Sequence, residues 1–401
     1  MTEPAVENSA PASPHAVSFV RRSKATGEES TFHVIGTAHV SKKSVDEVRA
    51  AIRALRPDTV CVELCPTRYA ALTDPARFRT LDVPAIVREG RAGFTLATLA
   101  LQAFQKRIGD RLGVRPGAEL LAATEAAKEV GATLVLADRD AQITLRRAWA
   151  NLGPVKRALL LVGLFASAFG DDTIDEEQIE QLKEREHVSD VMGDLGRKLP
   201  EVKVPLIDER DLYLTSHLEA VAGKTVVAVV GAGHVEGMLA SLGKATDRTA
   251  LEVVPRPSLA EHARGLLPLL VALAASGRAL ANGASPASLA MAWLLPIAVA
   301  LALSLVAARA RLESLLVALV AGPWLALVPG APGRVLGGLE ATVRNPTSED
   351  GARVGQNVTT MRAALANPAT RTLLVAVAAD HGAALGRLVA CGWLLVAALA
   401  G

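Results

Sequence analysis

The chain has 401 residues, half of them hydrophobic, and a formal net charge of +2. Its mean hydropathy of +0.30 is high for a soluble enzyme, and the small net charge gives no sign of a nucleic-acid partner. The three cysteines, an odd number, indicate no disulfide framework and favour a reducing compartment.

The hydrophobic residues are unevenly distributed along the chain. Residues 1–260 hold most of the charges, whereas 266–330 and 372–400 are dominated by Ala, Leu, Val and Gly. The N-terminus is polar, without periodicity, and lacks the features of a secretory signal, so the charged domain is expected in the cytoplasm. We therefore predict three parts: a disordered N-terminus at 1–17, an α/β domain at 18–260 and a helical membrane domain at 261–401.

A β-branched run that ends in Gly-x-x-His occurs twice. Residues 32–41 read FHVIGTAHVS and residues 225–235 read TVVAVVGAGHV, so His39 and His234 follow predicted strands in the same local pattern. In open α/β sheets, ligands bind beyond the carboxyl ends of the strands, where both histidines are expected. A single such motif is a weak indication, because most strand-end histidines are hydrogen-bonded loop residues, but two of only eight histidines share this context.

An acidic residue lies inside the next predicted strand. Glu63 interrupts the apolar run of residues 57–64, and a buried carboxylate is costly unless it is paired, hydrogen-bonded or bound to a metal. Residues 44–55 have helical spacing, and the resulting strand-helix-strand unit would bring His39 and Glu63 to the same edge of a sheet. Two imidazoles and one carboxylate are a common ligand set for a divalent metal with an open coordination position.

Other apolar runs predict further strands, at residues 132–138, 202–207 and 251–254. The first ends at Asp138, and Asp140 follows; both are candidates for the rim of a site, although strand-end aspartates are more often helix caps that pair with nearby arginines.

Glycines after the strand at 225–230 give a second interpretation of that motif. Gly231, Gly233 and Gly237 resemble part of a dinucleotide fingerprint. The spacing is wrong, however, and the next predicted strand has no acidic residue at its far end, so nucleotide binding is not favoured.

Four segments together resemble the TraB/PrgY family, whose wider superfamily includes the Tiki proteases and the GumN proteins. They are Gly-Thr-Ala-His-Val-Ser at 36–41, Val-Glu-Leu-Cys at 62–65 with Arg68 and Tyr69, Glu-Arg-Asp at 209–211 with Tyr213, and Gly-Ala-Gly-His-Val at 231–235. The resemblance covers about residues 30–255, and the apolar tail resembles that of PrgY-type members.

The resemblance implies a metal-dependent hydrolase site, carried here by His39, His234, Glu63 and Arg210. For the Tiki branch it implies proteolysis, and for PrgY-type members it implies inhibition or clearance of a peptide signal, as in pheromone shutdown. The tail favours the second branch. From the residues alone, Arg210 is equally expected to form a salt bridge with Glu209 or Asp211.

Our hypothesis is a mixed β-sheet flanked by helices, in which His39, Glu63 and His234 bind Mn, Co or Zn. Glu63 would serve as ligand or general base, and Arg210 would hold the scissile carbonyl or a terminal carboxylate of a peptide or protein substrate. The alternatives are a non-catalytic membrane protein that sequesters a signalling peptide or partner, and a structural protein with vestigial motifs. Association into a homo-oligomer is left open.

The C-terminal part contains several apolar runs. Residues 287–308 are long enough to span a bilayer, and 372–400 are apolar apart from three polar or charged side chains. Arginines between 331 and 371 favour the cytoplasmic side, which requires an even number of preceding crossings. We expect a multi-pass protein of the inner or plasma membrane, with the lipid bilayer as a partner and the α/β domain in the cytoplasm.

Overall fold

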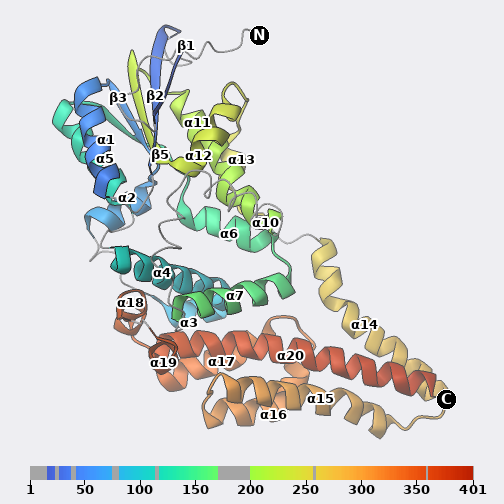
Figure 1. Cartoon of the computed structure of the whole chain (residues 1–401). Coiled ribbons are helices and arrows are strands. Elements are labelled where there is room, and N and C mark those ends of the chain that lie inside the picture. Colours follow the sequence, from blue (N-terminus) through green and yellow to red (C-terminus); the bar gives the residue numbers. More distant parts are fainter. Residues whose placement is uncertain are drawn as a thin grey trace. The chain divides into compact units, whose positions relative to one another are not determined.

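The computed structural model describes residues 16–22, 27–37, 42–74, 81–112, 117–169, 199–255, 259–357 and 360–400 (Figure 1). The chain divides into two compact units. Unit 1 comprises Met1–Phe78, Gln105–Ala158 and Asp171–Pro255, and unit 2 comprises Arg79–Phe104, Leu159–Gly170 and Arg256–Gly401. Unit 2 thus takes in residues 79–104, 159–170 and 256–260 of the segment 18–260 that the sequence assigns to the α/β domain.

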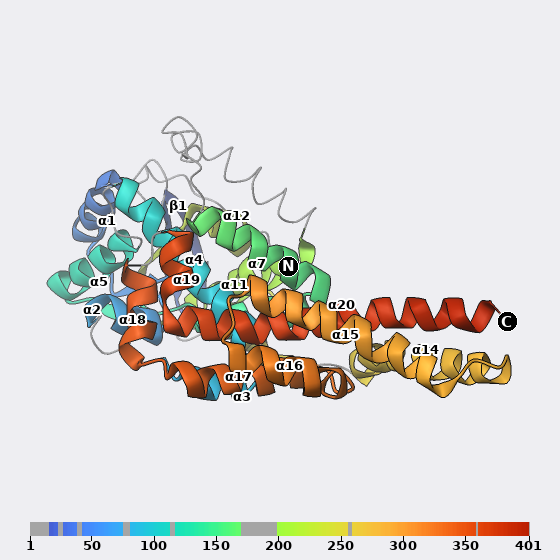
Figure 2. The same cartoon turned by 90° about the horizontal axis from the view of Figure 1, so that it is seen from below.

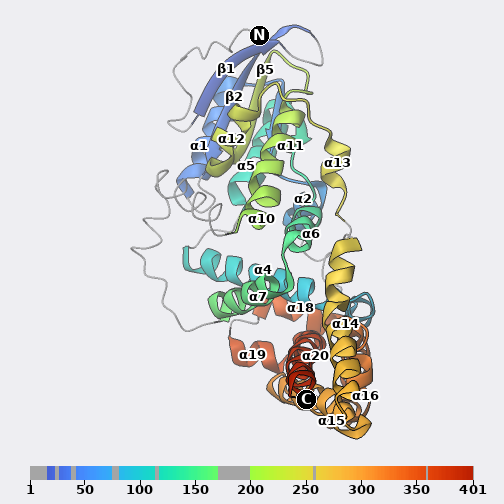
Figure 3. The same ribbon diagram turned by 90° about the vertical axis from the view of Figure 1, so that its right-hand side faces the viewer.

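Unit 1 is built on a five-stranded mixed sheet with the order β1-β2-β5-β3-β4. Its strands are β1 (Ala16–Arg22), β2 (Glu29–Thr37), β3 (Thr59–Val62), β4 (Thr133–Leu136) and β5 (Thr225–Gly231). Strand β5 runs parallel to β2 and β3, and β3 runs parallel to β4. Strand β1 lies antiparallel beside β2 at the edge of the sheet (Figure 3). The predicted mixed sheet is confirmed. Strand β1 was not predicted, and it begins at Ala16, so the predicted disordered segment 1–17 is wrong at its last two residues. Residues 1–15 of that segment lie outside the described residues.

Nine helical segments belong to unit 1 among the described residues. They are α1 (Lys42–Leu55), α2 (Pro66–Thr73), α5 (Ala118–Val130), α6 (Ala141–Asn151), α10 (Pro200–Lys203), the π-helix η2 (Val204–Asp208), α11 (Glu209–Leu218), α12 (Ala232–Ser241) and α13 (Arg248–Glu252). Helices α4 (Ala92–Leu112) and α7 (Pro154–Phe169) each contain residues of both units.

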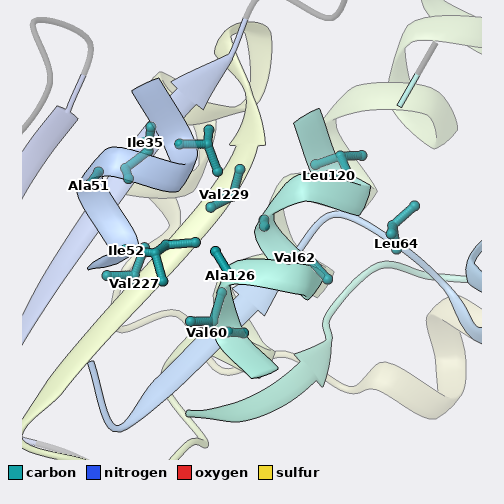
Figure 4. Packing of buried hydrophobic residues seen from close by; sticks show 13 residues of the cluster. Ile35, Ala51, Ile52, Val60, Val62, Leu64, Leu120, Ala126, Val227 and Val229 are labelled. Carbon is teal, nitrogen blue, oxygen red and sulfur yellow. The ribbon is translucent and has the colours of Figure 1, made fainter. Parts of the chain in front are cut away.

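Helices cover both faces of the sheet. Helices α1 and α5 pack on one face, where Val227 and Val229 of β5 are buried (Figure 4). Helices α11 and α12 pack on the other face, against Val226, Ala228 and Val230 of the same strand. Successive side chains of a strand point to opposite faces, so the unbroken apolar run of β5 is what a parallel strand buried on both sides requires.

Two predicted strands are wrong, because neither segment forms a strand. Residues 202–207 lie in α10 and η2, and residues 251–254 include the end of α13. Pro205 has no N–H to donate to a neighbouring strand, which disfavours a central strand, and Pro200 suits the first turn of a helix. Asp247 caps α13 by accepting hydrogen bonds from the backbone N–H groups of Thr249 and Ala250.

The secondary-structure elements described in unit 2 are all helices. Its helices are α3 (Val83–Arg88), α14 (Leu259–Ala281), α15 (Pro286–Ala307), α16 (Leu312–Leu325), α17 (Ala331–Arg344), α18 (Ser348–Asn357), α19 (Met361–Ala366) and α20 (Pro368–Leu399). Helix α20 packs against α14, α15 and α17 (Figure 2). A Cβ atom at Gly386 would lie 2.6 Å from the Cα of Ile297. Such close approach at small residues is common between membrane helices.

Among the residues that the structure describes, two helices, α15 and α20, are long and apolar enough to cross a membrane, judged by length and composition. Only 28% of the apolar window of α15 and 39% of that of α20 is buried within the protein, so most of these side chains face outward, as Leu303 and Val396 do. The core helix of a soluble protein would be mostly buried. This gives weak support for membrane association, while the number of crossings and their orientation stay predictions.

Candidate functional site

The candidate site lies at the carboxyl ends of neighbouring parallel strands. Glu63 is the first residue after β3, one position beyond its expected place inside the strand, and Asp138 follows β4. Gly231 ends β5, and His234 lies in the first turn of α12. Because β3 pairs with β5, this topology brings Glu63 and His234 together.

Both oxygens of the Glu63 carboxylate have partners. Oε2 accepts a hydrogen bond from the backbone N–H of Gly231 at 2.6 Å, and Oε1 accepts one from Nη2 of Arg210. Oε1 also lies 3.5 Å from Nε2 of His234. The side chain is only 4% exposed, so these contacts replace the water that a charged carboxylate would otherwise need.

Arg210 is held in the site by Asp138. Its Nε donates to Oδ1 of Asp138 at 3.0 Å and its Nη2 donates to Oδ2 at 2.8 Å, a two-point pairing that fixes the plane of the guanidinium. Burial alone lowers the pKa of Arg210, but the charges of Glu63 and Asp138 outweigh it and raise that pKa above its ordinary value. Arg210 is therefore a permanent cation between two buried carboxylates.

The local fold places Arg210 directly after a π-helix. The π-helix η2 ends at Asp208 and α11 begins at Glu209, so the Arg210 side chain projects from the first turn of α11. Its Nη1 donates to the carbonyl of Leu206 within η2 at 3.3 Å. Single π-turns inside helices are frequent at functional sites, because the widened turn changes the direction in which the next side chains point.

The contacts of His234 determine which ring nitrogen carries its proton. Nη1 of Arg210 lies 3.0 Å from Nε2, and a guanidinium can only donate, so Nε2 accepts. In the neutral ring Nδ1 then carries the proton and donates to Oδ1 of Asp211 at 2.6 Å. Burial raises the pKa of Asp211. The lone pair of Nε2 consequently faces Arg210 and Glu63, at the centre of the site.

The spacing of two atoms in this arrangement, though not their present partners, matches that of metal ligands: Nε2 of His234 and Oε1 of Glu63 each accept a hydrogen bond from Arg210. Two ligands of one tetrahedral zinc ion, at bond lengths of about 2.0–2.1 Å, lie about 3.4 Å apart, and Nε2 of His234 is 3.5 Å from Oε1 of Glu63. In the part of the chain that the structure describes, no three His, Cys, Asp or Glu side chains form a metal-ligand group. The third predicted ligand, His39, falls in residues 38–41, outside the described residues.

Two neighbouring acidic residues have structural partners. Asp140 caps α6 by accepting from the N–H of Gln142 at 2.7 Å, as the helix-cap interpretation predicts. Glu209 pairs with Arg139 and Arg147, each at 2.7 Å. The alternative in which Arg210 pairs with Glu209 or Asp211 is therefore wrong, since Arg210 pairs with Glu63 and Asp138 instead.

The sequence did not predict the roles of two residues at the site. Asp211 was expected only as a candidate salt-bridge partner of Arg210 within the Glu-Arg-Asp segment, and Gly237 only as part of a rejected nucleotide fingerprint. Gly237 lies inside α12, three positions after His234. A glycine within a helix, one turn from a candidate ligand, was the signal in the sequence that something approaches the helix there.

The chain is similar in sequence to two family models and to several known proteins. Residues 23–245 match the model of the TraB/PrgY/gumN family, and residues 262–399 match that of the TraB family protein, C-terminal domain. An uncharacterized protein of Methanocaldococcus jannaschii is 29% identical over 374 residues, 89% of this chain and 93% of that protein. A TraB domain-containing protein of Bos taurus is 30% identical over 312 residues, 71% and 79% of the two chains. A TraB domain-containing protein of Homo sapiens is 29% identical over 256 residues, which cover 57% of this chain and 67% of that protein.

Proposed function

The chain belongs to the TraB/PrgY/gumN family, and from this premise we propose that it is a membrane-anchored, metal-dependent hydrolase that acts on a peptide signal. The observation that carries the proposal is the 3.5 Å separation between Nε2 of His234 and Oε1 of Glu63. Both atoms accept hydrogen bonds from Arg210 in this structure, so metal binding requires the guanidinium to move away from them. His39 is the proposed third ligand, and Mn, Co or Zn the proposed ion.

The side chains have separate proposed tasks. Glu63 and His234 hold the ion, which when bound would supply Lewis acidity for polarising a carbonyl group and activating water. Arg210 binds the carbonyl or terminal carboxylate of the peptide. Its side chain is 15% exposed, against 4% for Glu63 and 2% for Asp138, so it is the charged group of this trio that a substrate reaches most easily.

The membrane anchor is proposed to be the helical part of unit 2. Residues 262–399 match a family C-terminal domain, and α15 and α20 are the two helices of sufficient length and hydropathy. We place them in the inner or plasma membrane, with unit 1 in the cytoplasm. Leu303→Arg puts a charge on the outward face of α15 and should impair insertion, at about 2.5–3.5 kcal/mol. Extraction of the wild-type chain by alkaline carbonate without detergent would contradict the anchor.

The first test is the metal content of the detergent-purified full chain, measured by mass spectrometry. About one equivalent of metal per chain is expected in the wild type, with clear loss in His39→Ala, His234→Ala and Glu63→Gln. Glu236→Gln is the matched control, because Glu236 is an exposed carboxylate on the same helix as His234. A wild-type chain without metal, even after reconstitution, would contradict the metal-dependent mechanism.

The second test separates hydrolysis from sequestration. The metal-loaded chain is incubated with a fluorogenic peptide library, and products are followed beside peptide binding at equilibrium. The proposal expects cleavage that Glu63→Gln abolishes while binding persists. Tight binding without product in the wild type, unchanged in Glu63→Gln, would favour a non-catalytic binder that retains a peptide in the same place.

A further inference from the structure

Asp211 contacts His234 at Nδ1, the ring nitrogen opposite the candidate metal position at Nε2, and Gly237 lies against Asp211. The Asp211 carboxylate, 6% exposed, accepts from Nδ1 of His234 at 2.6 Å. It projects from α11, whereas His234 and Gly237 both belong to α12, which packs against α11. Residues three apart on a helix lie on the same face, so Gly237 is one turn from the imidazole and faces the same neighbour.

Gly237 leaves the space that Asp211 fills. A Cβ atom added at Gly237 would lie 1.9 Å from Oδ2 and 2.6 Å from Cγ of Asp211, distances that no carbon atom tolerates. Glycine inside a helix is less favourable than alanine by about 1 kcal/mol. The close fit of the Asp211 carboxylate gives a physical reason for that cost.

We propose that Asp211 is a positioning residue for His234, and that Gly237 belongs to the same arrangement. Asp211 orients the ring and keeps its proton on Nδ1, which leaves Nε2 as the electron-pair donor next to Glu63. Gly237 admits the carboxylate to this position. The consequence for metal binding rests on the proposed function, whereas the hydrogen bond and the position of the proton do not depend on it.

A carboxylate behind an imidazole has a known effect on metal ligation. It fixes the tautomer and the ring orientation and makes the other nitrogen more basic, and its loss commonly weakens metal binding 10- to 100-fold. His33 offers an internal comparison, because its Nδ1 lies 2.7 Å from the Ser18 hydroxyl, a neutral partner, on strand β2.

The position of the proton is tested by ¹⁵N NMR of the metal-free, histidine-labelled full chain, with the His234 signals assigned from their loss in His234→Gln. The wild-type ring is expected to carry its proton on Nδ1, in a strong hydrogen bond. Asp211→Asn keeps an acceptor and should retain this signal, whereas Asp211→Leu and Gly237→Ala should shift it and speed its exchange with water. Arg210 also favours this tautomer, because it donates to Nε2, so the tautomer alone does not isolate the effect of Asp211. The chemical shift of the Nδ1 proton is therefore the decisive measurement.

Two controls accompany the NMR experiment. The His33 signals should stay unchanged in every variant, which shows that the domain remains folded. Gly163→Ala is the matched glycine control, since Gly163 lies inside helix α7 and a Cβ there meets nothing within 4 Å. A wild-type His234 ring protonated on Nε2, or an Nδ1 signal that Asp211→Leu leaves unchanged, would overturn the proposal.

Metal affinity distinguishes this inference from the proposed function. In competition with a chromophoric chelator, Asp211→Leu and Gly237→Ala should bind Zn²⁺ 10- to 100-fold more weakly than the wild type, with Gly163→Ala and Glu236→Gln unchanged. A wild type that binds no metal refutes the hydrolase mechanism, and the NMR result still decides the role of Asp211. A wild type that binds Zn²⁺ with the same affinity as Asp211→Leu refutes the positioning role and leaves the hydrolase proposal intact.

Discussion

Glu63 and Arg210, 147 residues apart in the chain, form a buried ion pair. Asp138 completes the cluster, because Nη2 of Arg210 donates to both carboxylates, so two carboxylates share one cation. Because the charges are removed from water, each is stable only while its partners are present. Substitutions of single members should therefore be far more damaging than substitutions of exposed charges nearby.

Arg210→Met should destabilise unit 1 by about 3–5 kcal/mol, because it leaves Glu63 and Asp138 buried without a counter-ion. Pulse proteolysis in urea measures the change on the full chain in detergent. Arg68→Met is the matched control: Arg68 lies 3.8 Å from Asp138 but its side chain is 39% exposed, so its loss should matter little. Equal effects of the two variants would show that the cluster does not depend on Arg210.

The pairing of Glu209 should make stability fall in acid. Burial raises the pKa of Glu209, but hydrogen bonds from Arg147 and Arg139 outweigh it and hold the pKa below 4.5. A carboxyl whose pKa is lower in the folded state stabilises the fold above its unfolded pKa, and this contribution disappears as the pH falls from about 4.5 through the folded value. Glu209→Gln should reduce the loss of stability at acid pH, which is measured by tryptophan fluorescence during unfolding. Glu129→Gln, which removes an exposed pair with Arg53, should leave that loss unchanged. The same acid slope in Glu209→Gln would contradict this origin.

Gly386→Ala should disrupt the contact between α15 and α20. The added methyl group would lie 2.6 Å from the Cα of Ile297, which is backbone and does not rotate away, so overpacking should cost about 1–3 kcal/mol. Gly392→Ala in the same helix meets nothing within 4 Å and should be neutral or slightly stabilising. Thermal denaturation in detergent compares the two, and the reverse order would refute the close packing.

Cys61 should resist alkylation in the folded protein. Burial raises the pKa of its thiol to about 12, so the reactive thiolate is scarce at neutral pH, and the side chain is inaccessible in the core. Peptide mapping after brief iodoacetamide treatment should find Cys61 unmodified in the native chain and modified in urea. An engineered Val20→Cys, at an exposed position of β1, is the positive control. Rapid native labelling of Cys61 would show that the sheet opens readily.

An apolar, β-branched run correctly predicted a strand where the strand is buried on both faces. It predicted a strand wrongly where a similar run forms helical turns. Residues 225–230 form the strand β5 because their β-branched side chains fill both layers. Residues 202–207 have a similar apolar pattern but contain Pro205, and they form helical turns. Strand β1 had no sequence signal beyond a short apolar run, because it pairs only with β2 at the sheet edge.

For the site, the sequence predicted residue types better than contacts. Strand-end position and polarity in an apolar run singled out Glu63 and His234, which the fold brings within 3.5 Å. The partners of Arg210 could not be deduced, because Asp138 and Glu63 meet it only through long-range strand order. The pairing of Asp211 with His234 could not be deduced either, since it depends on how α11 packs against α12.

The place of β5 in the sheet has a consequence for how the chain is made. Strands β2 and β3 are synthesised early, yet β5, which lies between them, leaves the ribosome last of the five. Until then both strands have an open edge, and open edges promote aggregation. The same segment leads directly into His234. Closing the sheet and assembling the site are thus one late event, so a truncated or unfinished chain has neither.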